Sequence, residues 1–274
     1  MPATIHDVVI SYPPVGPQTR QSLVDDLHAL GVREGGVLLI HTSLRSLGWV
    51  CGGALTVVQA LLDVLGPWGT LVVPSQTATN RDPSTWAPPP PQSWWPAIRE
   101  NLPGFDVART PSTAVGAITE QVRTWPGAVR SGHPQTSFAA IGARAAELMS
   151  VHRTDCHLGE DSPLAALAKA DAATLLLGVG YDRATAFHLG EYRVPDPPRR
   201  TYSCAVLTPG GERRWLEYED VVLDDHDFGR LGADFEHDTG LVTSGTVGAA
   251  NCRLFPIADA AGYAQRWFVR NRGA

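Results

Sequence analysis

The sequence lacks the features that mark several large classes of protein. No apolar run approaches the roughly 20 residues that a transmembrane helix needs, so we expect no membrane partner. The start, MPATIHDVVISYPP, has no basic stretch followed by an apolar one, which favours a cytoplasmic protein over a secreted one. Basic residues are not in excess, and the net charge of −6 argues against nucleic acid as a partner.

Several motifs of known chemistry are also missing. The cysteines at positions 51, 156, 204 and 252 form no CxxC pair, and we expect reduced thiols. There is no HExxH or HxH cluster, and His152 and His157 are flanked by polar residues typical of a loop, so no metal site is expected. The GxxxxGK[ST] and GxGxxG phosphate-binding loops and the GxSxG nucleophile motif are absent as well.

The pattern that is present is an alternation of helices and strands. Residues 19–31 repeat apolar positions at helical spacing, 37–40 read as a buried strand, 52–66 as a helix and 70–77 as a second buried strand. This order predicts an α/β fold with a mixed, partly parallel central sheet flanked by helices. With no repeat or linker evident, residues 1–274 are predicted to form a single domain.

The rest of the chain continues in the same way. The expected elements are a Ser/Thr-capped helix over 115–125, a strand over 137–142, a helix over 143–151, a helix capped by Ser162 with Pro163 in its first turn, a strand over 173–180, a hairpin over 200–220, and a Gly-rich strand before a terminal helix.

Two segments stand out by composition. Residues 80–104 are rich in Pro and Trp; Trp86, Trp94 and Trp95 either line a pocket or anchor the loop by burial, and their large apolar area favours anchoring. Residues 216–238 hold nine Asp or Glu and one Arg. That segment is either a solvated, flexible acidic face or an electrostatic collar for a polycation, and composition leaves both open.

Polar residues follow three of the predicted strands. HTSLRS, residues 41–46, leaves the first strand; PSQT, ending at Thr77, leaves the second; and GYDRATAFHLGE, residues 180–191, leaves the strand that ends near 178. Ligands of open α/β sheets bind at the carboxyl ends of the strands. These three loops are therefore the candidate site.

The third loop carries His188 and, three residues later, Glu191. With Thr185 as the N-cap of a helix, His188 falls near its third position and shares a helix face with Glu191. Such a pair is either an ordinary surface contact or a general base with the carboxylate that orients it and stabilises its imidazolium. The position after a buried strand favours the general base.

Two further polar turns are candidates for binding. In SGHPQTS, Pro134 makes the turn that contains His133 rigid. In GEDSPL, Glu160 and Asp161 precede a helix N-terminus, where they either bind cations or complement the helix dipole.

Taken in order, a set of short segments resembles the aminoglycoside 3-N-acetyltransferase family, which is distinct from the GNAT fold. The segments are LLIHTSLRSLG, LGPWGTLVVPSQT, RTPSTAVGAITE, RSGHPQTSFAAIG, LGEDSPLAAL, LLLGVGYDRATAFHLGEYR and GTVGAANCRL. They extend over most of residues 19–260. The Pro/Trp-rich residues 80–104 depart most from the family pattern, which leaves the acceptor open.

The resemblance implies transfer of an acetyl group from acetyl-CoA to the 3-amino group of an aminoglycoside, which confers resistance. It implies His188 as the base, Glu191 as its partner and Thr77 beside the acetyl group. Apart from the resemblance, we expect no metal and a monomeric or homodimeric protein. The residues it implies for CoA are His41, Thr42, Ser43, Leu44, Arg45, Ser112, Val115 and Gly116. The residues expected to bind the acceptor are Gln76, Glu160, Asp161, Asp224 and Asp225. The alternatives are another small amine as acceptor, such as an aminophosphonate or an amino sugar, and a CoA-binding protein without activity.

Overall fold

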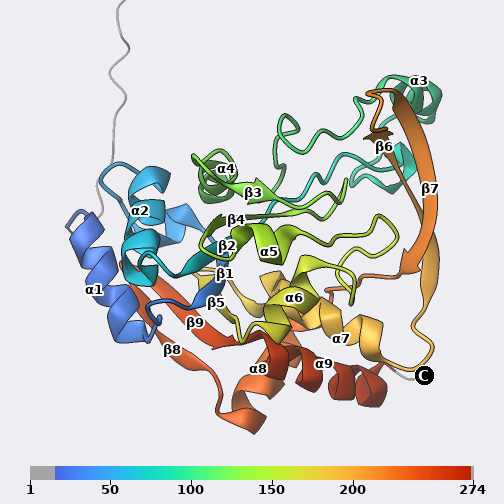
Figure 1. Ribbon diagram of the computed structural model, residues 1–274. Helices are drawn as coiled ribbons and strands as arrows, with labels where there is room; N and C mark the ends of the chain where they lie inside the picture. Colours follow the sequence, from blue (N-terminus) through green and yellow to red (C-terminus); the bar gives the residue numbers. More distant parts are fainter. Residues whose placement is uncertain (1–15, 273–274) are drawn as a thin grey trace, which may run out of the picture.

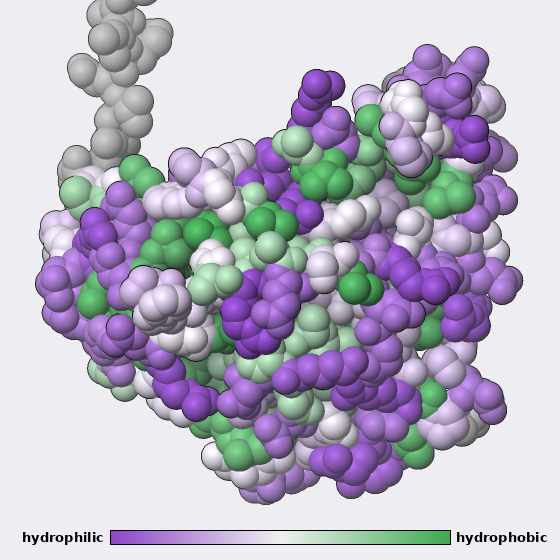
Figure 2. Space-filling model, in the orientation of Figure 1, coloured by the Kyte–Doolittle hydropathy of each residue, from purple (hydrophilic) through white to green (hydrophobic). Residues whose placement is uncertain are grey.

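The computed structural model describes residues 16–272. Residues 1–15, which carry the expectation that the chain is not secreted, lie outside this range, as do 273–274. Among the described residues, no helix has both the length and the apolar character that a membrane span needs. The face shown in Figure 2 mixes hydrophilic and hydrophobic residues.

A mixed sheet organises the molecule. Its seven strands lie in the order β3-β4-β2-β1-β5-β9-β8 (Figure 1). They are β1 (Val37–Thr42), β2 (Thr70–Pro74), β3 (Val129–Arg130), β4 (Phe138–Gly142), β5 (Ala173–Leu177), β8 (Thr243–Val247) and β9 (Ala250–Pro256). β1 runs parallel to β2 and β5, while the outer pairings are antiparallel. The predicted mixed, partly parallel sheet is confirmed.

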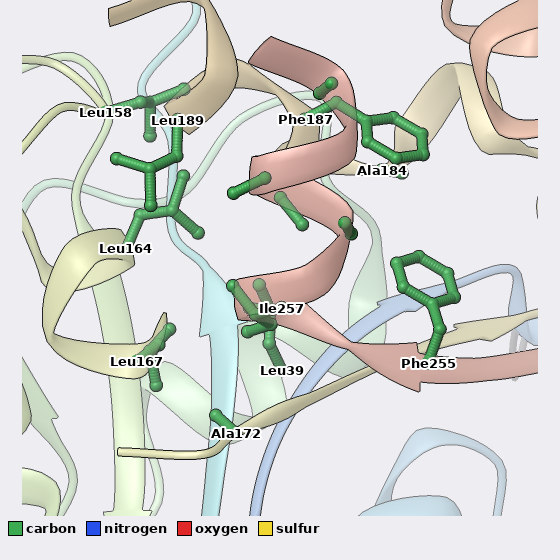
Figure 3. Close-up of a cluster of buried hydrophobic side chains, with 14 of the residues drawn as sticks. Leu39, Leu158, Leu164, Leu167, Ala172, Ala184, Phe187, Leu189, Phe255 and Ile257 are labelled. Carbon is green, nitrogen blue, oxygen red and sulfur yellow. The ribbon is translucent and has the colours of Figure 1, made fainter. Parts of the chain in front are cut away.

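Helices cover both faces of the sheet because its buried strands are apolar on both sides. Leu38 and Ile40 of β1 pack with α1 (Arg20–Leu30), α2 (Ala54–Leu65) and α4 (Ala117–Arg123). Leu39 points the other way, into the cluster of Figure 3, where it lies beside Ile257. The helices of that second face are α5 (Ala145–Met149), α6 (Pro163–Lys169), α7 (His188–Arg193), α8 (Phe228–Thr239) and α9 (Ile257–Asn271).

The predicted hairpin is a separate two-stranded sheet formed by β6 (Arg199–Leu207) and β7 (Arg213–Val221). Figure 1 shows it standing apart from the main sheet, next to the short helix α3 (Trp95–Asn101). Arg213 joins the two by donating to the carbonyl oxygen of Leu102 at 2.6 Å. The hairpin and the Pro/Trp-rich segment therefore form one wall of the molecule.

The caps predicted for α6 and α4 have opposite outcomes. Ser162 caps α6 by accepting from the Leu164 N–H, as expected. The helix predicted over 115–125 begins only at Ala117, and its N-cap is Gly116, with a φ of 87°, instead of a Ser or Thr. The hydroxyl of the nearby Thr113 instead accepts from the Ala78 N–H at 2.8 Å, in the loop after β2.

Candidate active site

The loops that follow β1, β2 and β5 meet at one edge of the sheet, where two cavities adjoin. One cavity has a volume of about 500 Å³ and the other of about 350 Å³. Gln76, His188 and Asp225 line both. Any group passed from a molecule in one cavity to a molecule in the other would pass beside these three side chains.

The larger cavity is lined by the loop after β1 and by the start of α4. His41, Thr42, Ser43, Leu44, Arg45, Val115 and Gly116, all predicted as CoA ligands, line it together with Arg183. Ser112 does not line it, because its hydroxyl is paired with the hydroxyl of Ser75 at 2.6 Å. The cavity thus combines loop backbone with two guanidinium groups, a set that suits phosphates and amides, although Arg183 also pairs with Asp182 at 3.1 Å.

His41 lies in this cavity as a neutral ring. Burial lowers its pKa to about 3, and the nearby His188 and Arg183 act in the same direction. Within residues 16–272 its Nε2 atom has no hydrogen-bond partner. His41 therefore offers a polar atom, and not a charge, to its surroundings.

His188 and Glu191 form a buried pair on α7. The Nδ1 atom of His188 lies 2.7 Å from Oε2 of Glu191, and the Glu191 side chain is only 4% exposed. The other carboxylate oxygen, Oε1, accepts from the Asp224 N–H at 3.1 Å and from Nη1 of Arg272 at 2.6 Å. Because an ionised carboxylate only accepts, Nδ1 must donate, which leaves Nε2 of a neutral His188 ring free to take a proton.

The cap predicted for this helix is wrong. Thr185 opens a 3₁₀ turn that ends at Phe187, and α7 begins at His188 with Phe187 as its N-cap. His188 is therefore the first residue of the helix instead of the third. Two consecutive 3₁₀ turns lead the chain out of β5 and bury Thr185, whose side chain caps nothing. The spacing of His188 and Glu191 on one face is unaffected.

The smaller cavity lies between the loop after β2 and the hairpin. Its lining residues are Gln76, Thr77, Ala78, Arg81, Asp82, Thr85, Gln135, Thr136, His157, Leu158, His188, Arg200, Thr201, Tyr202, Ser203, Leu223 and Asp225. Thr77 is buried, and its hydroxyl donates to the carbonyl oxygen of Pro134. Its single proton cannot therefore be given at the same time to another acceptor.

His157 belongs to this cavity, and sequence reasoning missed it by placing it in a polar loop. Its side chain is only 3% exposed, and Nδ1 lies 2.6 Å from Oδ2 of Asp220 on β7. Nε2 lies 3.0 Å from Oε1 of Gln135. Burial lowers the pKa of His157 even though Asp220 opposes the shift. Nothing local indicates this contact, because the two partners are 63 residues apart.

Charge in the smaller cavity is dominated by cations. Asp82 is bound by Arg99 at 2.7 Å, and this hydrogen bond lowers the pKa of Asp82 to about 2. Arg81 has a buried Nε without a partner, and Arg200 lies over the Tyr202 ring at 4.4 Å. Within the described part of the chain neither arginine is in an ion pair with a carboxylate, and Asp225 lines the same cavity, also without an ion-pair partner.

Three of the predicted acceptor-binding acids lie outside both cavities. Glu160 pairs with Arg193 at 2.7 Å, and Asp161 is a surface residue 3.9 Å from Arg153. Asp224 turns its carboxylate to His226. These acids serve surface ion pairs, and of the predicted set only Gln76 and Asp225 reach the site.

The two compositionally unusual segments are both ordered. In the acidic one, Asp220 is buried, Asp227 pairs with Arg272 and Glu236 pairs with Arg253, so these three acids are held by the fold. In the Pro/Trp-rich one, Trp86 and Trp95 donate to backbone carbonyls and Trp94 is 60% exposed. None of the three tryptophans lines the two cavities, which agrees with anchoring for Trp86 and Trp95.

Across residues 16–272, no three His, Cys, Asp or Glu side chains gather as metal ligands would.

Comparison with known proteins places this geometry in a family. The family model for aminoglycoside 3-N-acetyltransferases matches residues 39–269. The aminoglycoside N(3')-acetyltransferase-like protein YokD of Bacillus subtilis is 41% identical, over 93% of this chain and 94% of its own. Aminoglycoside N(3)-acetyltransferase IX of Micromonospora chalcea is 36% identical, over 92% and 94%.

Solved structures agree. The crystal structure of YokD has a TM-score of 0.91 at 40% identity and covers 94% of this chain and 96% of its own. AAC-VIa bound to sisomicin has a TM-score of 0.83 at 32% identity, covering 94% and 100%. AAC-IIIb in a binary complex with CoASH has a TM-score of 0.82 at 30% identity and covers 93% of this chain and 97% of its own. The resemblance, fold and enzyme class expected from the sequence are confirmed, and the chain belongs to the aminoglycoside 3-N-acetyltransferase family.

Proposed function

We propose that the protein transfers the acetyl group of acetyl-CoA to the 3-amino group of an aminoglycoside, with His188 as the general base. The observation that carries the proposal is that two cavities adjoin at His188, whose Nε2 is left free by the bond from Nδ1 to Glu191. The relatives crystallised with CoASH and with sisomicin support one cavity for each substrate.

In this proposal the larger cavity holds CoA. Residues 41–45, Val115 and Gly116 offer backbone donors to the pantetheine arm, and Arg45 and Arg183 face the phosphates. The acceptor occupies the smaller cavity, with Gln76 and Asp225 at the boundary. A cytoplasmic location and a monomeric or homodimeric state stay predictions.

The reaction follows from this placement. The free amine attacks the thioester carbon, forming the C–N bond, and its nitrogen loses a proton to Nε2 of His188. Glu191 stabilises the resulting imidazolium. When the C–S bond breaks, the thiolate leaves and takes that proton back from His188. Transfer is direct, since none of the four cysteines lines either cavity. Acetylation removes a positive charge from the drug, which is how it would confer resistance.

The tetrahedral intermediate needs a donor for its oxyanion. Thr77, the residue implied by the family resemblance, gives its proton to Pro134 in this structure and must rotate away before it can act. Gln76 also stands at the boundary, and within residues 16–272 its side-chain amide has no hydrogen-bond partner. We therefore propose Gln76 as a donor beside Thr77.

Release of free thiol from acetyl-CoA, measured against a panel of aminoglycosides, tests the proposal. We expect turnover with at least one of them, and His188→Ala should lower kcat by about 100-fold or more because the base is lost. His237→Ala, an exposed position, is the matched control. Binding of CoA without thiol release would indicate a non-enzymatic protein, and full activity of His188→Ala would rule out this base.

A second acceptor class is favoured by Arg81 and Arg200, which face the smaller cavity without carboxylate partners. Two cations disfavour a polycation but suit an amine that carries an anionic group, such as an aminophosphonate. The same thiol assay with amines bearing a phosphonate or carboxylate separates the two classes. For an amine with an anionic group, Arg81→Met should raise the acceptor KM. For an aminoglycoside, the same substitution should lower the acceptor KM.

A further inference from the structure

Glu191 has a second partner, at the end of the last helix, for the carboxylate oxygen that does not contact His188. Arg272 follows α9, and its Nη1 lies 2.6 Å from Oε1 of Glu191, 81 positions away in the sequence. The contact is largely shielded, with side-chain exposures of 23% for Arg272 and 4% for Glu191. The proposed mechanism uses His188 and Glu191 but assigns Arg272 nothing.

The guanidinium group is itself fixed by several partners. It binds both carboxylate oxygens of Asp227, at 2.9 Å through Nε and 2.5 Å through Nη2. Nη2 also donates to the carbonyl oxygen of Asp224 at 2.6 Å. The plane lies over the Phe268 ring, 3.9 Å from its centroid. A cation held in this way has a defined direction, unlike a mobile surface counter-ion.

We propose that Arg272 is a positioning residue, which keeps Glu191 aimed at His188 and ties this pair to the loop of residues 224–227. That loop donates the Asp224 N–H to Glu191 and carries Asp225 to the boundary of the two cavities. The inference rests on the proposed function, because it assumes that His188 is the base. It gives the C-terminal helix a part in the chemistry through one side chain.

The physical reason is that a buried carboxylate needs more than one partner. An ionised group that loses a hydrogen-bond partner in a site shielded from water is strongly destabilised, because no solvent takes the partner's place. With Arg272 present, the negative charge of Glu191 is shared between Arg272 and the ring of His188. Without it, the imidazolium that forms in the reaction is the remaining cation against Glu191, so His188 gives its proton to the leaving thiolate less readily.

Other charged and titratable groups also act on His188 and must stay unchanged in a test. They are His41 on β1, Asp182 and Arg183 in the turn after β5, His157 in the loop before α6, Glu191 on α7 and Asp225 before α8. Replacing Arg272 keeps the identity of all these residues, so a change in the pH profile reports the loss of the contacts that Arg272 makes with Glu191 and with the loop of residues 224–227.

A neighbouring cavity makes the test sharper. A space of about 340 Å³ is lined by Glu191, Arg272 and apolar side chains that include Val194, Val221 and Phe268. Shortening Arg272 leaves room for a small cation that enters from solvent. Methylguanidinium, the end of the missing side chain, is the natural probe.

The experiment compares kcat, KM and the pH dependence of kcat/KM for the wild type, Arg272→Ala and Arg272→Lys. We expect kcat of Arg272→Ala to fall about 10- to 100-fold, as misplaced catalytic groups do, with the KM for acetyl-CoA unchanged. The acid limb of its profile should move to higher pH. Arg272→Lys should fall between the two, and methylguanidinium should restore part of the activity of Arg272→Ala. Arg270→Ala, an exposed arginine on the same helix, should behave as wild type.

The outcomes separate this inference from the function on which it rests. If Arg272→Ala keeps the wild-type kcat and acid limb while His188→Ala is inactive, the positioning role is wrong and the base stands. If His188→Ala is active, both are wrong. Should Arg272→Ala fail to fold, Arg272→Lys decides: a wild-type pH profile and kcat in that variant, which cannot reproduce the planar multiple contacts, overturns the proposal.

Discussion

Gly190 shows how closely the site depends on single residues. It lies between His188 and Glu191 on α7, where the helix meets α9 so closely that a Cβ atom would stand 2.7 Å from the backbone nitrogen of Gln265 and 2.7 Å from Cβ of Ala264. Real Cβ atoms do not approach backbone so closely, so a larger residue must push the two helices apart. A glycine in a helix, otherwise unfavourable, is required here by packing.

Gly190→Ala should therefore harm both stability and catalysis. We expect the free energy of unfolding, measured in urea, to fall by about 1–3 kcal/mol, as overpacking does. kcat should fall as well, because α7 carries the base, while the KM for acetyl-CoA changes little. Gly262→Ala on α9 is the control, since its Cβ would meet nothing closer than Nη1 of Arg266 at 3.6 Å. Equal stability of the two variants would contradict the close approach.

Sequence reasoning reached those parts of the site that are local in the chain. His188 and Glu191 are three positions apart, so helical spacing alone brings them to one face. The partners that complete the site are remote: Asp220 is 63 positions from His157, and Arg272 is 81 from Glu191. Only the fold decides such pairs, and no spacing rule finds them.

At the scale of elements, the buried strands and the longer helices were predictable because apolar runs and helical periods are strong signals. The residues at which the helices begin were harder to predict. Gly116 and Phe187 occupy N-cap positions that the sequence assigned to hydroxyl residues, since tertiary bridges and 3₁₀ turns compete for the same chain. The hairpin was expected, but its attachment to the Pro/Trp-rich segment was not.

Asn80, the first residue of that segment, contributes to the attachment together with Arg213. Its side-chain amide imitates a strand, accepting from the Ala205 N–H at 2.9 Å and donating to the Ala205 carbonyl at 3.0 Å. The same Nδ2 also donates to Pro134 at 3.1 Å. Asn80 is buried, so these bonds are shielded from water. Through them the β6–β7 hairpin, one wall of the smaller cavity, is joined to the loop after β2.

Asn80→Ala should loosen this wall. The buried Ala205 N–H would lose its partner, which costs about 1–3 kcal/mol of stability. We expect the KM for the acceptor to rise while that for acetyl-CoA stays constant, as steady-state kinetics would report. Asn80→Asp should be at least as harmful, because it sets an oxygen against the carbonyls of Ala205 and Pro134. Asn101→Ala, an exposed position on α3, is the control; a rise in the acetyl-CoA KM with Asn80→Ala would contradict the assignment of the cavities.

At the scale of the whole molecule, three of the eight histidines in residues 16–272 are buried as neutral rings. Burial lowers the pKa of His41 to about 3, that of His133 well below 6.5, and that of His157 despite its bond to Asp220. In the unfolded chain each would take a proton near its ordinary pKa of about 6.5. Below that pH the unfolded state therefore binds more protons than the folded one.

The buried histidines make the folded protein less stable in acid. The free energy of unfolding is highest above the unfolded pKa of about 6.5. It falls as the pH decreases toward the lowered pKa values of the folded state, by up to about 1.4 kcal/mol per pH unit for each such histidine. Urea unfolding at a series of pH values should show a steep loss that begins in mildly acidic solution, well above the titration of the carboxylates. His133→Asn should be less stable at neutral pH but have a shallower slope, by about one proton. His237→Asn, at an exposed position, should keep the wild-type slope. A wild-type stability that is flat down to the titration of the carboxylates would mean that these rings take up protons without unfolding.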